Sequence, residues 1–239
     1  MSDYEKMTVG SSSAIKRFSH GRRYRTTLKL LDVGWGDSVL DFGAGDGHLL
    51  SMIADTAPQA VDLFAYEPVE SMFKQLCDSL LASAAPGRTA IHPIHNLLYL
   101  RGGFDRIACC EVLEHLPEVV RREALYTIRR MLDPDGFAVV SVPIEVGTAS
   151  LLKNAARLAI GQAHPGTTAA NLFRSFFGLP IARPAQDGFI PSHIGFYYQV
   201  LEQEFEDAGL RIVRRKFSPF PWLHRFVNSQ VFYVLRRSM

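Results

Sequence analysis

A glycine-rich turn follows a short apolar segment near the start of the chain. The segment Val39-Leu40-Asp41-Phe42 runs into Gly43-Ala44-Gly45-Asp46-Gly47, and a helical pattern begins at His48. Glycine at alternate positions lets a backbone turn tightly and approach a ligand without a Cβ in the way. The dinucleotide-binding pattern GxGxxG needs glycine at position 48, where this chain has histidine. The turn is therefore predicted to bind a ligand, and the histidine disfavours a nicotinamide cofactor.

Two later segments place acidic residues at the ends of apolar runs. Glu67 ends the run Phe64-Ala65-Tyr66 and lies twenty residues after Gly47. Residues 104–117 read FDRIACCEVLEHLP, in which two adjacent cysteines precede Glu111. Open α/β sheets bind ligands at the carboxyl ends of their strands, which is where such residues would lie.

The three segments together resemble a known family. The GxGxG turn with Asp41 before it resembles motif I of the class I S-adenosylmethionine-dependent methyltransferases. Residues 104–117 are similar to the pattern of a subgroup that includes the ubiquinone-biosynthesis O-methyltransferases. The likeness extends over residues 21–142 and, more weakly, over 193–213. It implies an enzyme that transfers a methyl group from S-adenosylmethionine to an oxygen, or as second choice a nitrogen, of a small-molecule acceptor, and releases S-adenosylhomocysteine.

The resemblance also implies roles for charged residues. A carboxylate at Glu67 can accept hydrogen bonds from both ribose hydroxyls of the cofactor. Arg23 lies twenty residues before Gly43 and has the forked guanidinium that holds a carboxylate, in this case that of the methionine part. The alternative is that Arg23 belongs to a solvated basic face with Arg22 and Arg25.

The remaining cofactor contacts implied by the resemblance lie after later strands. Cys110 and Glu111 are expected at the methionine end, and Asn96, or His95 in its place, at the adenine amino group. The predicted cofactor-binding residues are Arg23, Asp41, Gly43, Ala44, Gly45, Gly47, Glu67, Pro68, Asn96, Cys110 and Glu111. No metal ion is predicted, because His92 and His95 have the spacing of a ligand pair but no third ligand nearby.

Methyl transfer from a sulfonium needs little acid–base chemistry. Positioning the reactants can lower a barrier by roughly 7–11 kcal/mol, whereas a general base contributes a factor of about 10²–10⁴. If a base is used, His193 is the candidate, because it precedes a helix that borders the acceptor pocket in related methyltransferases. An imidazole has a suitable ordinary pKa near neutrality. His115 is the rival candidate, with a structural role in its loop as the alternative for either histidine.

Composition restricts the class of protein. The chain has 239 residues, 47% of them hydrophobic, which is enough for one globular domain. Its formal charge of +2 gives no overall field that would favour nucleic acid. The three cysteines lack disulfide or zinc spacing, and no signal peptide or membrane-spanning segment is evident, so a cytoplasmic location is expected.

Strand-like and helix-like segments alternate, which predicts a doubly wound α/β fold with a mostly parallel, seven-stranded, Rossmann-like sheet. A flexible segment is expected at 1–19, followed by a single methyltransferase domain over 20–239. The predicted strands are 38–42, 61–66, 104–110, 136–142, 210–217 and 231–235, together with one that ends before Asn96. The predicted helices are 20–31, 48–55, 69–84, 118–131 and 196–208, with two shorter ones at 149–160 and 169–177.

Residues 144–192 interrupt this alternation and are expected to form a lid-like helical insertion over the carboxyl edge of the sheet. Its apolar residues suggest an acceptor with an aromatic or lipid-like part. The same surface could instead pack on a second subunit or, with its cations, touch a membrane surface. The apolar stripe consists of Leu151, Leu152, Ala155, Leu158 and Ala159, the aromatic residues are Phe173, Phe176, Phe177 and Phe189, and the cations are Lys153, Arg157 and Arg174.

Two other functions compete with the enzyme. A catalytically inactive, cofactor-binding domain that acts as a scaffold or partner subunit would carry the same glycine turn. A nucleic-acid methyltransferase would need a basic cleft, and the chain lacks NPPY-like or Pro-Cys catalytic motifs. The oligomeric state is left open.

Overall fold

One seven-stranded sheet forms the centre of the molecule in the computed structural model. The structure describes residues 14–56, 60–83, 89–145, 168–186, 188–223 and 228–238, with side chains from residue 21 onward apart from that of Pro221. The strand order is β3-β2-β1-β4-β5-β7-β6. The strands are β1 (Ser38–Phe42), β2 (Asp62–Tyr66), β3 (Ile91–Ile94), β4 (Phe104–Cys110), β5 (Leu132–Pro143), β6 (Leu210–Ser218) and β7 (Gln230–Arg237).

Strands β1 to β5 pair in parallel, and β7 runs antiparallel to both β5 and β6. The predicted α/β class with a mostly parallel, Rossmann-like sheet is thereby confirmed. Because the connections reverse at β1 and β4, the carboxyl ends of these two neighbouring strands flank the crevice where doubly wound sheets bind ligands.

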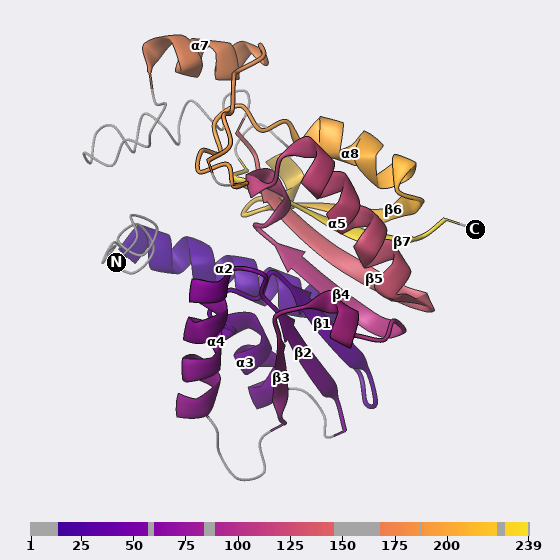
Figure 1. The fold of residues 1–239 in the computed structure, drawn as a ribbon. Helices are drawn as coiled ribbons and strands as arrows, with labels where there is room; N and C mark the ends of the chain where they lie inside the picture. Colours follow the sequence, from indigo (N-terminus) through magenta and orange to yellow (C-terminus); the bar gives the residue numbers. More distant parts are fainter. Residues whose placement is uncertain are drawn as a thin grey trace.

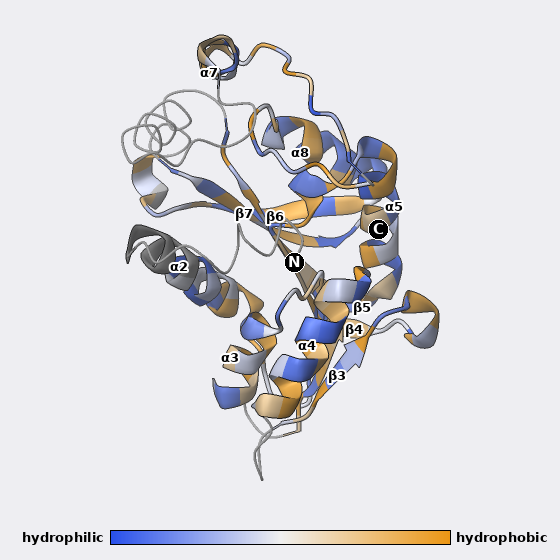
Figure 2. Ribbon diagram, turned by 60° about the vertical axis from the view of Figure 1, so that its left-hand side comes forward, coloured by the Kyte–Doolittle hydropathy of each residue, from blue (hydrophilic) through white to orange (hydrophobic). Residues whose placement is uncertain are grey.

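Helices cover both faces of the sheet (Figure 1). They are α2 (Ala14–Leu31), α3 (His48–Thr56), α4 (Glu70–Ala82), α5 (Glu118–Met131), α7 (Ala169–Phe177) and α8 (Tyr198–Asp207), with short 3₁₀ turns η1 (Leu97–Tyr99), η2 (Leu113–His115) and η3 (Pro221–Leu223). Helices α2, α3 and α4 pack on one face, while α5 and α8 pack on the other. Each helix carries both hydrophilic and hydrophobic residues (Figure 2), as a helix with one buried side does.

Successive residues of a central strand supply two different cores. Val39 packs with the α2 and α3 side, whereas Leu40 packs with the α5 and α8 side. Val139 and Val140 divide in the same way. Strands that are buried on both faces have continuous apolar sequences, which explains why these segments were predicted as strands.

A buried ion pair joins α5 to α8 on the second face. The guanidinium of Arg121 donates from Nε and Nη2 to the two carboxylate oxygens of Glu204, each over 2.6 Å. Both side chains are at least nine-tenths buried. A bidentate pair of this kind fixes the angle between the two helices.

Two boundaries differ from the prediction by more than three residues. Helix α2 begins at Ala14 rather than at 20, so residues 14–19, expected in a flexible segment, have helical backbone. Strand β5 begins at Leu132 rather than at 136, and it includes the expected turn Pro134–Gly136 as a bulge. Leu132 pairs with Phe104, and the next paired residue of β5, Phe137, pairs with Arg106. A Cβ at Gly136 would lie 2.6 Å from the carbonyl oxygen of Phe104, so glycine allows this close approach.

The insertion is described only in part. The predicted helix 149–160, with the apolar stripe from Leu151 to Ala159, lies outside the described residues. Helix α7 confirms the prediction at 169–177 and stands apart from the sheet, beyond the carboxyl ends of its strands (Figure 1). Phe173 and Phe177 of this helix are about 60% exposed. Within the described part of the chain, no helix combines the length and the apolar character needed to traverse a bilayer.

Candidate active site

The glycine turn between β1 and α3 is anchored to the end of β2. The backbone N–H groups of Gly43 and Ala44 both donate to the carbonyl oxygen of Tyr66 over 2.9 Å. Glycine is favoured at 43 and 47 because φ is positive at both, at 87° and 76°, and because a Cβ would lie 2.5 Å from Val112 Cγ2 and 2.7 Å from Leu76 Cδ1 respectively. At Gly45 a Cβ would meet nothing closer than 3.8 Å, so this part of the turn leaves room for a ligand.

Glu67 faces this turn, as the resemblance implied. Its Oε2 accepts a hydrogen bond from the backbone N–H of Gly45, and its Oε1 accepts one from Val69, each over 3.0 Å. The residue is 5% exposed, and this burial raises the pKa of Glu67 even though the two N–H donors lower it. A carboxylate oxygen can accept more than one hydrogen bond, so Glu67 retains capacity for a hydroxylated ligand.

Asp41 lies at the end of β1 on the floor of the same site. It is 3% exposed, and burial raises its pKa to about 7, with the charges of Glu67 and Asp46 adding to the effect. Neighbouring carboxylates repel one another, so a positively charged ligand here would favour the ionised form of Asp41.

Arg23 reaches the site from α2. Its Nη1 lies 3.3 Å from Glu111 Oε2, and both side chains are less than 20% exposed. Burial acts to lower the pKa of Arg23, but the Glu111 carboxylate, together with Tyr24 and Cys110, outweighs it and the pKa is raised. Glu111 adopts a left-handed backbone conformation with φ of 59°, which is unusual for a residue with a side chain and is typical of functional sites.

A small cavity brings five of the eleven predicted cofactor-binding residues together. Its lining consists of Arg23, Tyr24, Asp41, Gly43, Ala44, Leu49 and Cys110. Burial raises the pKa of Cys110 to about 11, and Thr27 Oγ1 lies 3.4 Å from its sulfur. The thiol therefore stays protonated near neutrality and serves as a lining group, not as a nucleophile.

The residues expected at the adenine end are placed differently. Asn96 is exposed, and its Oδ1 caps η1 by accepting a hydrogen bond from the backbone N–H of Leu98 over 2.9 Å. His95 Nδ1 lies 3.0 Å from the carbonyl oxygen of Glu67, and its Nε2 lies 3.2 Å from Glu70 Oε2. Pro68 is exposed beside Glu67. None of these three residues lines the described cavity.

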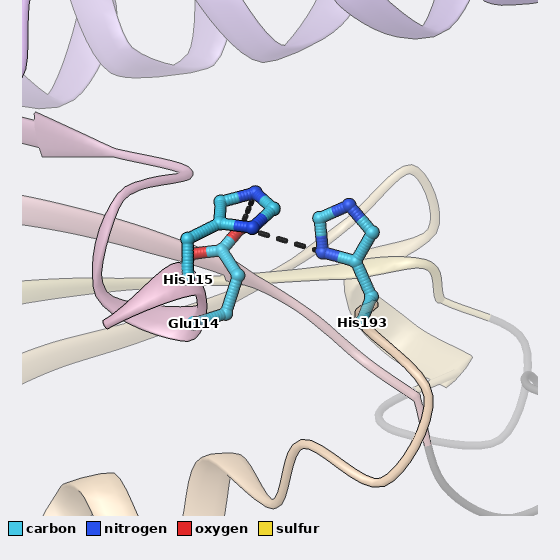
Figure 3. Close-up of side chains that lie close together, drawn as sticks. All are labelled: Glu114, His115 and His193. Atoms are coloured by element: carbon cyan, nitrogen blue, oxygen red, sulfur yellow. Dashed lines mark ion pairs between the residues drawn. The ribbon is translucent and has the colours of Figure 1, made fainter. Parts of the chain in front are cut away.

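The two candidate catalytic histidines lie together around a buried carboxylate (Figure 3). His115 Nε2 and His193 Nδ1 lie 4.0 and 3.8 Å from Glu114 Oε1. The two rings meet edge to face with centroids 4.6 Å apart, and Phe189 stacks on His115 at the same centroid distance. Burial lowers the pKa of His115. Burial, together with the charge of Glu111, raises the pKa of Glu114 well above its ordinary range.

Hydrogen bonds fasten the segment that carries His193 to the turn that carries His115. Ile190 N–H donates to the carbonyl oxygen of His115 over 2.7 Å, and His115 Nδ1 lies 2.8 Å from the carbonyl oxygen of Ile190. Arg183 Nη2 donates to the backbone oxygens of Glu114 and Ser192 over 2.6 and 2.8 Å. The turn η2 and the segment that carries His193, although distant in sequence, thus form one wall of the site next to β4.

Sequence reasoning missed Tyr24, Leu49 and Glu114. Tyr24 and Leu49 line the cavity from α2 and α3, and their apolar spacing identified them only as helix residues. Glu114 stands within the segment 104–117 but was given no role, because its complete burial has no signal in the sequence. The three side chains Glu114, His115 and His193 present ligand atoms within 4.8 Å of one another, close enough to hold a metal ion.

The groups in and beside the cavity suit the cofactor implied by the resemblance. The open space at Gly45 allows close approach, the carboxyl groups of Asp41 in the cavity and of Glu67 beside it suit hydroxyl and cationic groups, and Arg23 suits a carboxylate. When bound, S-adenosylmethionine supplies an electrophilic methyl group. The chain supplies the groups that hold it and a polar wall at the ends of β4 and η2.

Comparisons with known proteins identify the family and the fold. A family profile described as "Methyltransferase domain" matches residues 14–215. A search of curated proteins found no match. Among solved structures, the CcbJ methyltransferase from Streptomyces caelestis has a TM-score of 0.61 at 16% identity, with 90% of this chain and 89% of that chain covered. The magnesium protoporphyrin IX methyltransferase from Synechocystis PCC 6803 with bound SAH has a TM-score of 0.59 at 17% identity, covering 95% and 89%.

A third structure, the mitomycin 7-O-methyltransferase MmcR, has a TM-score of 0.54 at 16% identity over 85% of this chain. The present chain spans about half of its length, since 49% of that chain is covered. These likenesses show the fold, and the profile shows the family. The chain belongs to the methyltransferase-domain family and is an enzyme whose cofactor is S-adenosylmethionine.

Proposed function

We propose that the protein transfers the methyl group of S-adenosylmethionine to an oxygen of a small-molecule acceptor, with nitrogen as the second choice. The observation that carries the proposal is that the cofactor cavity and the cluster of His115 and His193 share one short stretch of chain, residues 110–115. Cys110 lines the cofactor cavity, Glu111 pairs with Arg23 there, and Glu114 and His115 follow within one turn. An acceptor beside the histidines would therefore lie next to the cofactor.

The wall formed by His115, Phe189 and His193 supports an acceptor with a flat aromatic part. The rings of His115 and Phe189 are nearly parallel, at 13°. Flat stacked rings favour another ring placed against them. The mitomycin 7-O-methyltransferase acts, by its name, on an oxygen, and this agrees with an oxygen acceptor here.

His193 is the proposed group that takes the acceptor's proton. The ring of His115 is held by Ile190 and Phe189, and its side chain is 14% exposed, against 23% for His193. The more exposed imidazole can meet an acceptor more easily. We also propose a cytoplasmic location, which the three free thiols support.

Turnover of a panel of phenols, catechols and carboxylic acids tests this function, with S-adenosylhomocysteine as the measured product. His193→Ala should lower kcat by a factor of about 10²–10⁴ while cofactor affinity, measured by calorimetry, stays unchanged. His92→Ala is the matched control, because His92 is exposed on β3 and lies against Phe64.

Two results would contradict the proposal. Cofactor binding without turnover of any acceptor would favour the scaffold function. Turnover restricted to RNA or DNA, with a steep dependence on salt, would favour a nucleic-acid substrate.

A further inference from the structure

We infer that Glu114, His115 and His193 form a binding site for one divalent transition-metal ion, of the zinc, cobalt or manganese type. The three side chains come from two places in the chain, the 3₁₀ turn η2 and the segment before α8. Figure 3 shows both imidazole rings beside the carboxylate, with ion-pair contacts converging on it.

The spacing of the donor atoms fits an ion held between them. Glu114 Oε1 lies 4.0 Å from His115 Nε2 and 3.8 Å from His193 Nδ1, and all three donor atoms fall within 4.8 Å of one another. Metal–ligand bonds of about 2.0–2.2 Å place ligand atoms roughly 3.3 Å apart in a tetrahedral site. To close the set around an ion, the two distances from Glu114 to the histidines must shorten by about 0.5–0.7 Å and the distance between the two histidine nitrogens by up to about 1.5 Å, movements that small rotations of the side-chain torsions supply.

Glu114 provides the second, independent observation. Its side chain is 0% exposed, and neither carboxylate oxygen has a hydrogen-bond partner within the described part of the chain. The adjacent Arg183 donates to the backbone oxygen of Glu114 and not to its carboxylate. Burial of a carboxyl group without hydrogen bonds is unfavourable; the charges of Arg23 and Arg183 offset part of this cost, and an ion between the three side chains would offset it directly.

The contacts of His115 prepare it to be a ligand. Its Nδ1 lies 2.8 Å from the carbonyl oxygen of Ile190, which can only accept, so Nδ1 carries the proton. The lone pair is then on Nε2, the atom that faces Glu114. A histidine ligand with its other nitrogen bonded to a backbone carbonyl is the usual arrangement in metal sites, because the second contact fixes the ring and its tautomer.

The donor set indicates the class of ion. Two imidazole nitrogens and one carboxylate oxygen suit zinc and its neighbours, whereas calcium takes six to eight oxygen ligands, about twice what is available here. Three protein ligands leave coordination positions open, which is the pattern of a catalytic rather than a structural site.

Binding of the ion is independent of the proposed function, whereas its role in the transfer rests on that function. An acceptor hydroxyl that occupies the open position would become more acidic and release its proton to water. The oxygen lone pair would then form the new bond to the methyl carbon as the carbon–sulfur bond breaks, with S-adenosylhomocysteine leaving. His193 would act as a ligand instead of as a base.

Cobalt titration of the chelator-treated full chain tests the site, because tetrahedral Co²⁺ absorbs visible light. We expect one Co²⁺ per chain, displaced by Zn²⁺ in calorimetry. Glu114→Gln and His193→Ala should each weaken binding at least about tenfold, while His92→Ala binds as the wild type does. Unchanged binding in both site variants, or no binding by the wild type, would overturn the inference.

Two further measurements distinguish loss of the ion from loss of folding and from failure of the proposed function. Cofactor binding and thermal unfolding of each variant show whether it is folded; should Glu114→Gln fail to fold, His193→Ala and His115→Gln replace it. Chelator-treated enzyme that binds S-adenosylmethionine, turns over no acceptor and recovers with Zn²⁺ or Co²⁺ supports the role of the ion. Full turnover after chelation overturns that role and leaves the proposed function intact.

Discussion

The cofactor side and the acceptor side of the crevice are built in different ways. The cofactor side uses backbone and short-range geometry: the Gly43–Gly47 turn, the carbonyl oxygen of Tyr66 and the carboxyl groups at the ends of β1 and β2. The acceptor side depends on contacts between residues about 75 positions apart, such as His115 with Ile190. The difference teaches that the glycine turn and its carboxyl anchors are determined by nearby sequence, whereas the acceptor side, like the Arg23–Glu111 pair, exists only once the chain is folded.

The most severe change on the cofactor side is Gly45→Arg. Its side chain would fill the open space at the turn, so we expect cofactor affinity to fall at least about 1000-fold, or roughly 4 kcal/mol. Calorimetric titration with S-adenosylmethionine measures the loss. Gly36→Arg is the matched control, since Gly36 also has a positive φ, of 79°, but nothing lies near its Cβ position. Equal losses in both variants would mean that backbone strain, and not ligand exclusion, is the cause.

The carboxyl group of Asp41 predicts how stability changes with pH. Burial raises its pKa to about 7 in the folded protein, whereas an unfolded chain has the ordinary value near 3.9. The folded state thus holds this proton more tightly, and the free energy of unfolding should fall as pH rises from about 4 to about 7, then level off. The fall is on the order of 4 kcal/mol.

Urea unfolding of the wild type and of Asp41→Asn across this pH range measures the effect. The asparagine variant should lose this part of the pH dependence, whereas Asp62→Asn, at an exposed position on β2, should keep it. Identical profiles for the wild type and Asp41→Asn would show that another group is responsible.

The acceptor side can be weakened separately through the Arg121–Glu204 pair. Arg121→Met leaves the Glu204 carboxylate buried without its partner, so the free energy of unfolding should drop by about 3 kcal/mol. Cofactor affinity of the folded protein should change little if the two sides are independent. Arg122→Met is the control, since its pair with Glu118 is exposed. A large loss of cofactor affinity in Arg121→Met would show that the two sides are coupled.

A smaller effect is expected from Glu67→Gln. The amide can satisfy only one of the two N–H donors of Gly45 and Val69, and it lacks the charge that strengthens hydrogen bonds to hydroxyls. Cofactor affinity should fall about 10- to 100-fold. Calorimetry against Glu70→Gln, whose side chain is 85% exposed, separates this loss from a general effect of charge.

The same contrast explains what the sequence could predict. The glycine turn and Glu67 follow apolar strands directly, so their position needs only the strand order. Arg23, which reaches the cavity from α2, was predicted through the family resemblance, because this helix has little amphipathic periodicity. Asn96 was expected near adenine but caps η1, because a short polar side chain competes for a nearby backbone N–H. The helical backbone at 14–19 was also not predicted, because helix α2 as a whole has little amphipathic periodicity.

The acceptor side gave weaker signals for a physical reason. Burial of Glu114 and the approach of His193 result from the docking of residues 181–194 on η2, which no local pattern encodes. His92 and His115 are the same residue type, and they differ only in the groups that folding places around them.

The left-handed backbone at Glu111 has an evolutionary consequence. Glycine at this position would relieve strain of about 1–3 kcal/mol and make the fold more robust, but it would remove the carboxylate that Arg23 contacts. Selection for durability and selection for ligand affinity therefore pull this single position in opposite directions. A chain of this kind that has lost its ligand is expected to drift toward glycine there.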